Sequence, residues 1–307
     1  MKIAITGATG LVGQRLVERL YPKHELLVLS RNEAKAQRTF PASAYPNLHI
    51  VTYTPTESGS WQDRISGCDV VINLAGAPIA EQRWTPNYKE EILRSRQVGT
   101  EKIVEAIAKA AEKPQVLINT SAVGYYGTSE TATYTETSAA GNDFLAEVCQ
   151  KWEAAAQKAE SFGTRTVILR FGIVLAKEGG ALGKMLLAFN TFAGGPLGTG
   201  KQWVSWIHRD DLVSLIETAL TEPVWQGIYN GTAPNPVTMG TLAQTLGAVM
   251  KRPSWLPVPG FVLELLLSDG AKVVLEGQKV LPQRTEAAGF RFKFPDLKDA
   301  LVDLLSR

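Results

Sequence analysis

Short apolar runs alternate with longer amphipathic stretches over about the first 170 residues of the chain. Each run is apolar throughout rather than at every second position, which is typical of strands covered on both faces. The stretches between the runs carry apolar residues at helical spacing. Strands are expected at 2–6, 26–29, 70–74, 116–118 and 166–170, and helices at 11–20, 87–111 and 143–161. This order predicts an α/β fold with a doubly wound parallel sheet.

The texture of the sequence changes beyond about residue 173. Glycines become frequent, and the proline-rich stretch 252–260 cannot form regular structure because proline lacks a backbone donor. Residues 290–294 alternate like a half-buried strand, and 296–305 has the pattern of a closing helix. We therefore expect a sheet domain over 1–172, with part of 205–230 as an optional addition. A smaller α+β lobe over 173–307 is expected to pack on the carboxyl edge of the sheet.

Composition excludes several classes of protein. The chain has 307 residues, 45% of them hydrophobic and 20% charged, and its net charge of +2 gives no reason to expect nucleic acid or a membrane surface as partner. The cysteines Cys68 and Cys149 form no CxxC pair, and His24, His49 and His208 lack the spacing of zinc ligands. We expect a cytoplasmic protein without a metal site. The oligomeric state is open, with a homodimer as one option.

A glycine-rich turn follows the first strand. Gly7 allows a tight turn, Gly10 lets backbone amides approach a phosphate, and Gly13 lets the next helix pack closely on the strand. The helix dipole and the free amides at this position favour a pyrophosphate, as in the Rossmann-type dinucleotide fold. A structural turn without ligand is the alternative. The residues expected to contact the dinucleotide here are Thr6, Gly7, Thr9, Gly10, Leu11, Val12 and Gly13.

The end of the second strand distinguishes the two nicotinamide dinucleotides. NAD-binding proteins carry an acidic residue about 20 positions after the turn, where it bonds the ribose 2′-hydroxyl. This chain has Ser30 and Arg31 there instead. A guanidinium matches a 2′-phosphate in charge and shape, so the sequence favours NADP(H) over NAD. A solvated loop arginine is the alternative for Arg31.

Further blocks resemble the extended, sugar-epimerase-like branch of the short-chain dehydrogenase/reductase superfamily. These are the turn at 6–13, the block 69–76, the pair of segments 119–122 and 125–127, and the block 198–211. The chain is most similar to the atypical "epimerase family" proteins of unassigned activity, which share 257–259 and 277–282. The resemblance implies an NADP(H) site that also includes Leu74, Ala75, Gly76 and Thr120.

The superfamily uses a tyrosine and a lysine four residues apart on one helix, beside a serine. The aligned positions in this chain are Leu145 and Cys149, and neither can exchange a proton with a carbonyl or an alcohol as that pair does. As a replacement we expect Ser121 to orient a substrate oxygen and Tyr125, or its neighbour Tyr126, to donate the proton. The alternative is that both tyrosines only pack in a loop.

The substrate block also departs from the family pattern. Sugar-nucleotide epimerases clamp the substrate diphosphate with an arginine, and that position is Val204 here, which argues against a nucleotide-sugar substrate. Trp203 and Trp206 fit either a flatter ligand or simple core packing. His208 is a candidate acid or a packing residue, in the second case with Asp210 as the cap of a helix over 212–220.

Two arginines complete the candidate site. Arg96 lies on the helix after the fourth strand, where the resemblance implies a cofactor contact, and a surface ion pair is the alternative. Arg170 ends a strand near the carboxyl edge, and an anionic cofactor group is its expected partner. Together these features predict an NADP(H)-dependent oxidoreductase or epimerase of a small carbonyl or alcohol compound. The competing prediction is a non-catalytic NADP(H)-binding sensor or regulatory module.

Overall fold

The computed structural model describes residues 1–306, and its centre is a seven-stranded sheet in the order β3-β2-β1-β4-β5-β7-β11. Every neighbouring pair in this sheet runs parallel, and the strand order reverses on either side of β1. This confirms the doubly wound α/β sheet expected from the apolar runs. The strands are β1 (Lys2–Thr6), β2 (Glu25–Ser30), β3 (Leu48–Thr52), β4 (Val70–Asn73), β5 (Val116–Ala122), β7 (Arg165–Phe171) and β11 (Gly227–Gly231).

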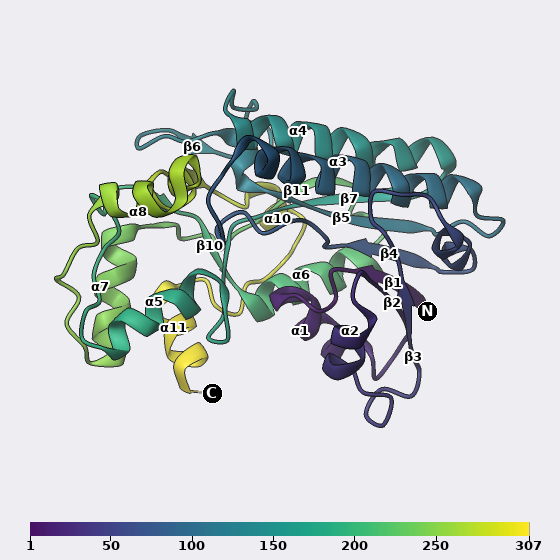
Figure 1. Cartoon of the computed structure of the whole chain (residues 1–307), viewed down its shortest axis with the longest axis horizontal. Coiled ribbons are helices and arrows are strands. Elements are labelled where there is room, and N and C mark those ends of the chain that lie inside the picture. The colour runs from purple at the N-terminus through teal and green to yellow at the C-terminus, as the bar shows by residue number, and fades with distance from the viewer. Residues whose placement is uncertain (307) are drawn as a thin grey trace.

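Helices cover both faces of the sheet, which explains why its strands are apolar throughout (Figure 1). Alternate residues of β1 point to opposite faces, so Ile3 and Ile5 join one core and Ala4 joins the other. The first core is closed by α1 (Leu11–Leu20), α2 (Glu33–Thr39) and α6 (Arg209–Thr221). The second is closed by α3 (Pro86–Lys109) and α4 (Phe144–Gln157), which lie side by side in Figure 1.

Further helices gather beyond the carboxyl ends of the strands (Figure 1): α5 (Gly180–Asn190), α7 (Met239–Met250), α8 (Gly260–Leu267), α9 (Lys272–Leu275) and α11 (Leu297–Ser306). The short helix α10 (Gln283–Ala287) lies against β11. Short strands pair among them and beside the sheet: β8 (Ile173–Leu175) with β10 (Trp206–His208), β9 (Trp203–Val204) with β12 (Val237–Thr238), and β6 (Thr133–Tyr134) with β13 (Lys279–Val280). Single 3₁₀ turns are η1 (Ser60–Ile65), η2 (Val123–Tyr126), η3 (Lys158–Phe162) and η4 (Ser268–Ala271).

The strand expected at 290–294 was wrong. Phe290 and Phe294 are buried as the alternating pattern requires, but the segment pairs with no strand. The two oxygens of the Asp211 carboxylate accept from the amides of Lys293 and Phe294, both at 2.9 Å. A side chain therefore satisfies the backbone that a neighbouring strand would otherwise satisfy. The closing helix is confirmed as α11.

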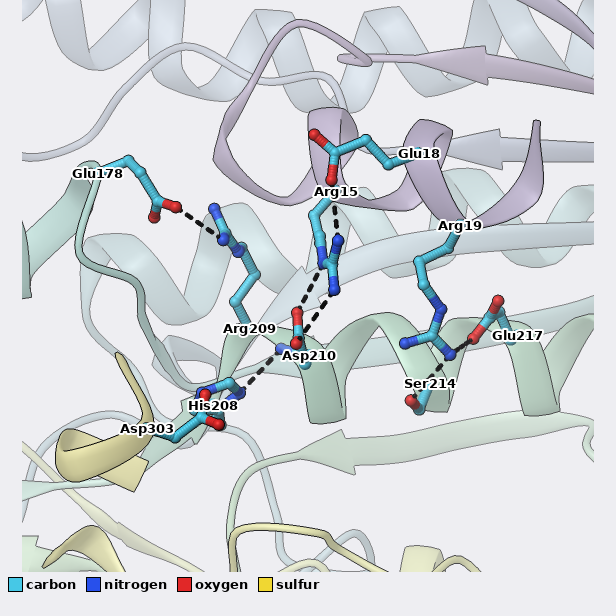
Figure 2. A network of polar contacts seen from close by, with 10 residues as sticks. All are labelled: Arg15, Glu18, Arg19, Glu178, His208, Arg209, Asp210, Ser214, Glu217 and Asp303. Carbon is cyan, nitrogen blue, oxygen red and sulfur yellow. Dashed lines mark hydrogen bonds and ion pairs between the residues drawn. The ribbon is translucent and has the colours of Figure 1, made fainter. Parts of the chain in front are cut away.

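A polar network joins the helix after the glycine turn to the C-terminal helix (Figure 2). Arg15 on α1 donates to both oxygens of Asp210 on α6, at 2.8 and 3.3 Å. The Asp210 amide donates to Nδ1 of His208 at 3.0 Å, and His208 Nε2 lies 3.3 Å from Asp303 on α11. His208, not Asp210 as expected, therefore caps α6. The His208 ring is buried, and its two nitrogens link α6 to α11.

Over residues 1–306, no helix combines the length and the apolar character that a membrane span needs.

The contact between α1 and the glycine turn gives a test of the fold. A Cβ atom at Gly13 would lie 2.4 Å from the Gly7 carbonyl oxygen and 2.6 Å from the Ala8 Cα atom. Gly13→Ala is therefore expected to lower the free energy of unfolding by about 1–3 kcal/mol, the usual cost of overpacking. Urea denaturation measures this change.

The matched control is Gly99→Ala on α3, where a Cβ atom would meet nothing closer than 3.8 Å. This variant is expected to be unchanged, or more stable by up to about 1 kcal/mol, because alanine favours a helix over glycine. Equal effects of the two substitutions would contradict the packing account.

Candidate functional site

The carboxyl ends of β1, β4 and β5 are joined by a buried polar network centred on Asn73. The Asn73 amide donates to Thr100 Oγ1 at 2.9 Å and to Asn119 Oδ1 at 2.7 Å. Its carbonyl oxygen accepts from Thr6 Oγ1 at 2.7 Å. Thr120 Oγ1 donates in turn to the Asn73 backbone oxygen at 2.7 Å. Because both ends of the carboxamide are satisfied, the network fixes three strands and α3 in one register.

Thr6 uses its hydroxyl to hold the loop that follows β4. The amides of Leu74 and Ala75 both donate to Thr6 Oγ1 at 3.2 Å. The Thr6 side chain is fully buried and supports this loop from beneath, and the cofactor contact expected of Thr6 stays a prediction. The exposed surface at this edge belongs instead to Gly76 and to the turn.

The glycine turn has the geometry that a pyrophosphate requires. Gly7 has a φ of +68°, and a Cβ atom there would lie 2.8 Å from the Leu74 carbonyl group. Gly10 caps α1 without a side-chain hydrogen bond, and the first turn of α1 holds no acidic residue. The amide groups at this helix N-terminus are thus left for an anion, and the backbone of the turn is close enough to the β4 loop to form one cradle. The residues present fit a dinucleotide phosphate.

The end of β2 leaves one cation exposed. The Ser30 hydroxyl is engaged locally, donating to the Asn32 carbonyl oxygen at 3.0 Å and accepting from the Asn32 amide at 3.2 Å. Asn32 then caps α2 by accepting from Lys35 N at 2.8 Å. The Arg31 side chain is exposed, and over residues 1–306 no carboxylate forms an ion pair with it. Arg31 is therefore available to a phosphate beside the turn.

A second buried network lies under the neighbouring strands β5 and β7. Glu153 on α4 holds Arg170 through two hydrogen bonds of 2.8 and 2.7 Å, and both side chains are almost fully buried, at 4% and 1% exposure. Ser121 Oγ donates to the same carboxylate at 2.6 Å. Arg170 thus has a protein anion as its partner, and the cofactor contact expected of it stays a prediction. The pair satisfies a charge that would otherwise be costly to bury.

The adjacent tyrosines have different surroundings. Tyr126 is buried, donates to Asn230 Oδ1 at 2.7 Å and accepts from Arg170 at 3.0 Å. Burial raises the pKa of Tyr126 to about 12, so it holds its proton firmly. Tyr125 is only partly buried, and its ring lies 3.3 Å from the guanidinium carbon of Arg170. Of the two expected proton donors, only Tyr125 is partly exposed.

The helix positions of the missing tyrosine and lysine face the same region. A Cβ atom at Gly124 would lie 3.3 Å from the Leu145 Cβ atom, so Leu145 packs against the turn that carries the tyrosines. Cys149 is buried, and its thiol donates to the Ala122 carbonyl oxygen at 3.6 Å. Burial raises the pKa of Cys149 to about 11, so the thiol is neutral near pH 7. Lys151 is exposed and pairs with Glu147 at 2.6 Å, as expected of a solvent-facing lysine.

Arg96 reaches over this region from α3. Its guanidinium carbon lies 5.2 Å from the Trp152 ring centroid. A Cβ atom at Gly76 would lie 3.0 Å from the same guanidinium carbon. The hydrogen bond recorded for Arg96 goes to the Ile92 carbonyl oxygen on its own helix, at 3.2 Å. The surface ion pair that was the alternative for Arg96 is not found among residues 1–306. Burial lowers the pKa of this guanidinium.

The substrate block is largely core. Trp206 and Val204 are fully buried, while Trp203 is partly buried and donates through Nε1 to the Glu130 carbonyl oxygen at 2.8 Å. Trp206 is therefore part of the hydrophobic core. Within residues 1–306, no three His, Cys, Asp or Glu side chains are grouped so that they could hold a metal ion.

Glu153 is the site residue that the sequence reasoning missed. The helix positions 145, 149, 152 and 156 are apolar and face the sheet, and Glu153 lies among them, four residues after Cys149. A carboxylate on the buried face of a helix needs a cation, and Arg170 was the strand-end arginine without an assigned partner. This helix pattern was the available signal.

Three comparisons with known proteins agree. Residues 3–230 match the model of the NAD dependent epimerase/dehydratase family, and 258–304 match a domain of unknown function, DUF1731. The chloroplastic epimerase family protein SDR39U1 homolog of Arabidopsis thaliana is 51% identical over 304 residues, covering 98% of this chain and 86% of that protein. The epimerase family protein YfhF of Bacillus subtilis is 41% identical over 308 residues, covering 100% and 98%.

A solved structure gives the same result. The crystal structure of human epimerase family protein SDR39U1 (isoform 2) with NADPH has a TM-score of 0.87 and 34% identity, covering 100% of both chains. The resemblance drawn from the motif blocks is confirmed by a family model that spans most of the chain. This chain belongs to the NAD dependent epimerase/dehydratase family.

Proposed function

We propose that this protein is an NADP(H)-dependent oxidoreductase or epimerase that acts on a small carbonyl or alcohol compound. The observation that carries the proposal is the cradle formed by the glycine turn, the uncapped N-terminus of α1 and the β4 loop, with Arg31 exposed beside it. The structural relative from human was crystallised with NADPH, which supports the same cofactor here.

The proposed contacts follow from position. The amides at the start of α1, from Leu11 to Gly13, bind the pyrophosphate, with Gly7, Thr9 and Gly10 shaping the turn. Arg31 binds the 2′-phosphate as a bidentate donor, and Ser30 fixes the local turn that presents it. The loop residues Leu74, Ala75 and Gly76, with Thr120 on β5, support the rest of the dinucleotide.

NADP(H), when bound, supplies or removes a hydride at a carbon atom of the substrate. In the proposal Tyr125 exchanges the proton with the substrate oxygen. Ser121 is almost fully buried and donates its own proton to Glu153; in the proposal its oxygen accepts a hydrogen bond from a substrate hydroxyl. Glu153 and Arg170 act as positioning residues: Glu153 orients Ser121, and Arg170 lies against the Tyr125 ring.

A non-catalytic NADP(H)-binding sensor is the second candidate. The apolar Leu145 and the neutral Cys149, at the positions of the family's tyrosine and lysine, favour it. The two candidates differ in whether any member of a panel of carbonyl compounds is reduced with NADPH. Both candidates bind small molecules.

We propose a cytoplasmic location because both cysteines are free and buried, as in proteins of a reducing compartment.

The choice of cofactor is tested by titration with NADPH and NADH, followed by nicotinamide fluorescence. Wild-type protein is expected to prefer NADPH. Arg31→Ala is expected to weaken NADPH binding about 10- to 100-fold, since a charge-assisted hydrogen bond contributes about 1.5–3 kcal/mol, and to leave NADH binding unchanged.

Arg38→Ala is the matched control for Arg31, because Arg38 is exposed on the adjacent helix α2 and should have no effect. Absence of binding to either dinucleotide would remove the proposed function. Binding of both with equal affinity would remove the role of Arg31 alone.

The proton donor is tested by Tyr125→Phe and Tyr126→Phe with any carbonyl compound that is turned over. Tyr125→Phe is expected to lower kcat by about 100-fold or more, as loss of a general acid does, with thermal stability unchanged. Tyr126→Phe is expected to destabilise the fold by about 1–3 kcal/mol, because Asn230 and Arg170 lose a buried partner. Unchanged kcat in Tyr125→Phe would show that another group donates the proton.

A further inference from the structure

The charge of Arg96 is compensated less fully than that of three other arginines, Arg170, Arg15 and Arg165. Arg170 is paired with Glu153, and Arg15 with Asp210. Arg165 donates to the carbonyl oxygens of Ala219 and Leu220 near the end of α6, and to that of Trp225. Arg96 donates to the Ile92 carbonyl oxygen of its own helix and lies over the Trp152 ring. No carboxylate of residues 1–306 forms an ion pair with it.

The groups around Arg96 do not supply the missing negative charge. The two ionisable groups that act electrostatically on Arg96 are Cys149 on α4 and Tyr88, and the Cys149 thiol is neutral near pH 7. Tyr88, the other, donates its hydroxyl proton to the Pro78 carbonyl oxygen. Glu153 on α4 is already bonded twice to Arg170. The Arg96 side chain is only partly exposed, so an anion would stabilise its charge, and no carboxylate of residues 1–306 forms an ion pair with it.

The position of Arg96 points to a ligand rather than to solvent. The guanidinium lies over Gly76, which is exposed and follows the carboxyl end of β4. Cys149, which acts electrostatically on Arg96, donates to the Ala122 carbonyl oxygen at the end of β5. In an open α/β sheet this edge, next to the reversal in strand order, is where ligands bind.

We propose that Arg96 binds a carboxylate group of the substrate, so that the substrate is an anionic carbonyl or hydroxy acid. This inference rests on the proposed function and deepens it. In that function the start of α1 holds the pyrophosphate and Arg31 the 2′-phosphate, so the two charged parts of the cofactor have other partners. A planar guanidinium pairs with a carboxylate through two parallel hydrogen bonds, which also fixes the orientation of the substrate beside Tyr125.

The test measures binding of small carboxylates to the NADPH-loaded protein by calorimetry at constant ionic strength. The probes are oxamate and acetate, with the neutral amides oxamide and acetamide as their controls. Wild type is expected to bind at least one carboxylate about 10-fold or more tightly than its amide, the size of one charge-assisted hydrogen bond. Arg96→Met is expected to lose this preference, and Arg96→Lys to keep part of it, because charge remains while the planar fork is lost.

The matched control is Arg94→Met, which removes an exposed arginine from the same helix and should leave the preference intact. Thermal unfolding identifies any variant that fails to fold, and Arg96→Lys then carries the comparison. No carboxylate preference in wild type, or an equal preference in Arg96→Met, overturns the inference. So does a loss of NADPH affinity in Arg96→Met without any carboxylate preference, since the anion would then be a cofactor phosphate. Failure of wild type to bind NADPH would instead remove the proposed function itself.

Discussion

The carboxamide of Asn73 is the interaction on which the ligand edge of this sheet depends. It is buried at the end of β4, where it bonds to Thr6 of β1, Asn119 of β5 and Thr100 of α3. Removing one member of such a network leaves several buried polar groups without partners, which costs more than a single hydrogen bond is worth. The β4 loop and the glycine turn are fixed relative to each other because both are tied to this point through Thr6.

The sheet could be predicted from sequence wherever the strands are central. Central strands are covered on both faces, so β1, β2, β4, β5 and β7 are apolar enough to be recognised. The edge strands β3 and β11 went unpredicted because they are less fully covered and carry polar residues such as His49 and Asn230. Residues 290–294 misled for the opposite reason: they alternate like a strand, but the Asp211 carboxylate takes the place of the neighbouring strand.

Local features of the candidate site could also be predicted from the sequence. The glycine turn and the Arg31 position depend on short-range geometry, and a motif of a few residues specifies it. The apolar face of α4 indicates that Glu153 is buried, but its pairing with Arg170 depends on how α4 packs across β5 and β7. The same holds for Arg96. Its proposed role depends on the absence of an ion pair with any carboxylate of residues 1–306, which its neighbours in sequence do not reveal.

The two arginines illustrate how one family fold can adapt to the loss of a catalytic pair. Arg170, held by Glu153, places positive charge against the Tyr125 ring, and Arg96 places it beside Cys149, where the superfamily has a lysine. The first charge is balanced inside the protein. In our proposal the second is balanced by a carboxylate of the substrate, so it would contribute to affinity and not to folding.

The central claim is that the dinucleotide binds where the glycine turn meets the β4 loop. Hydrogen exchange of the protein with and without saturating NADPH tests this most directly, because the amides of both segments are available to report it. The account predicts slower exchange over residues 9–14 and 74–77 together. Unchanged exchange in both segments, with protection confined to another part of the chain, would contradict it.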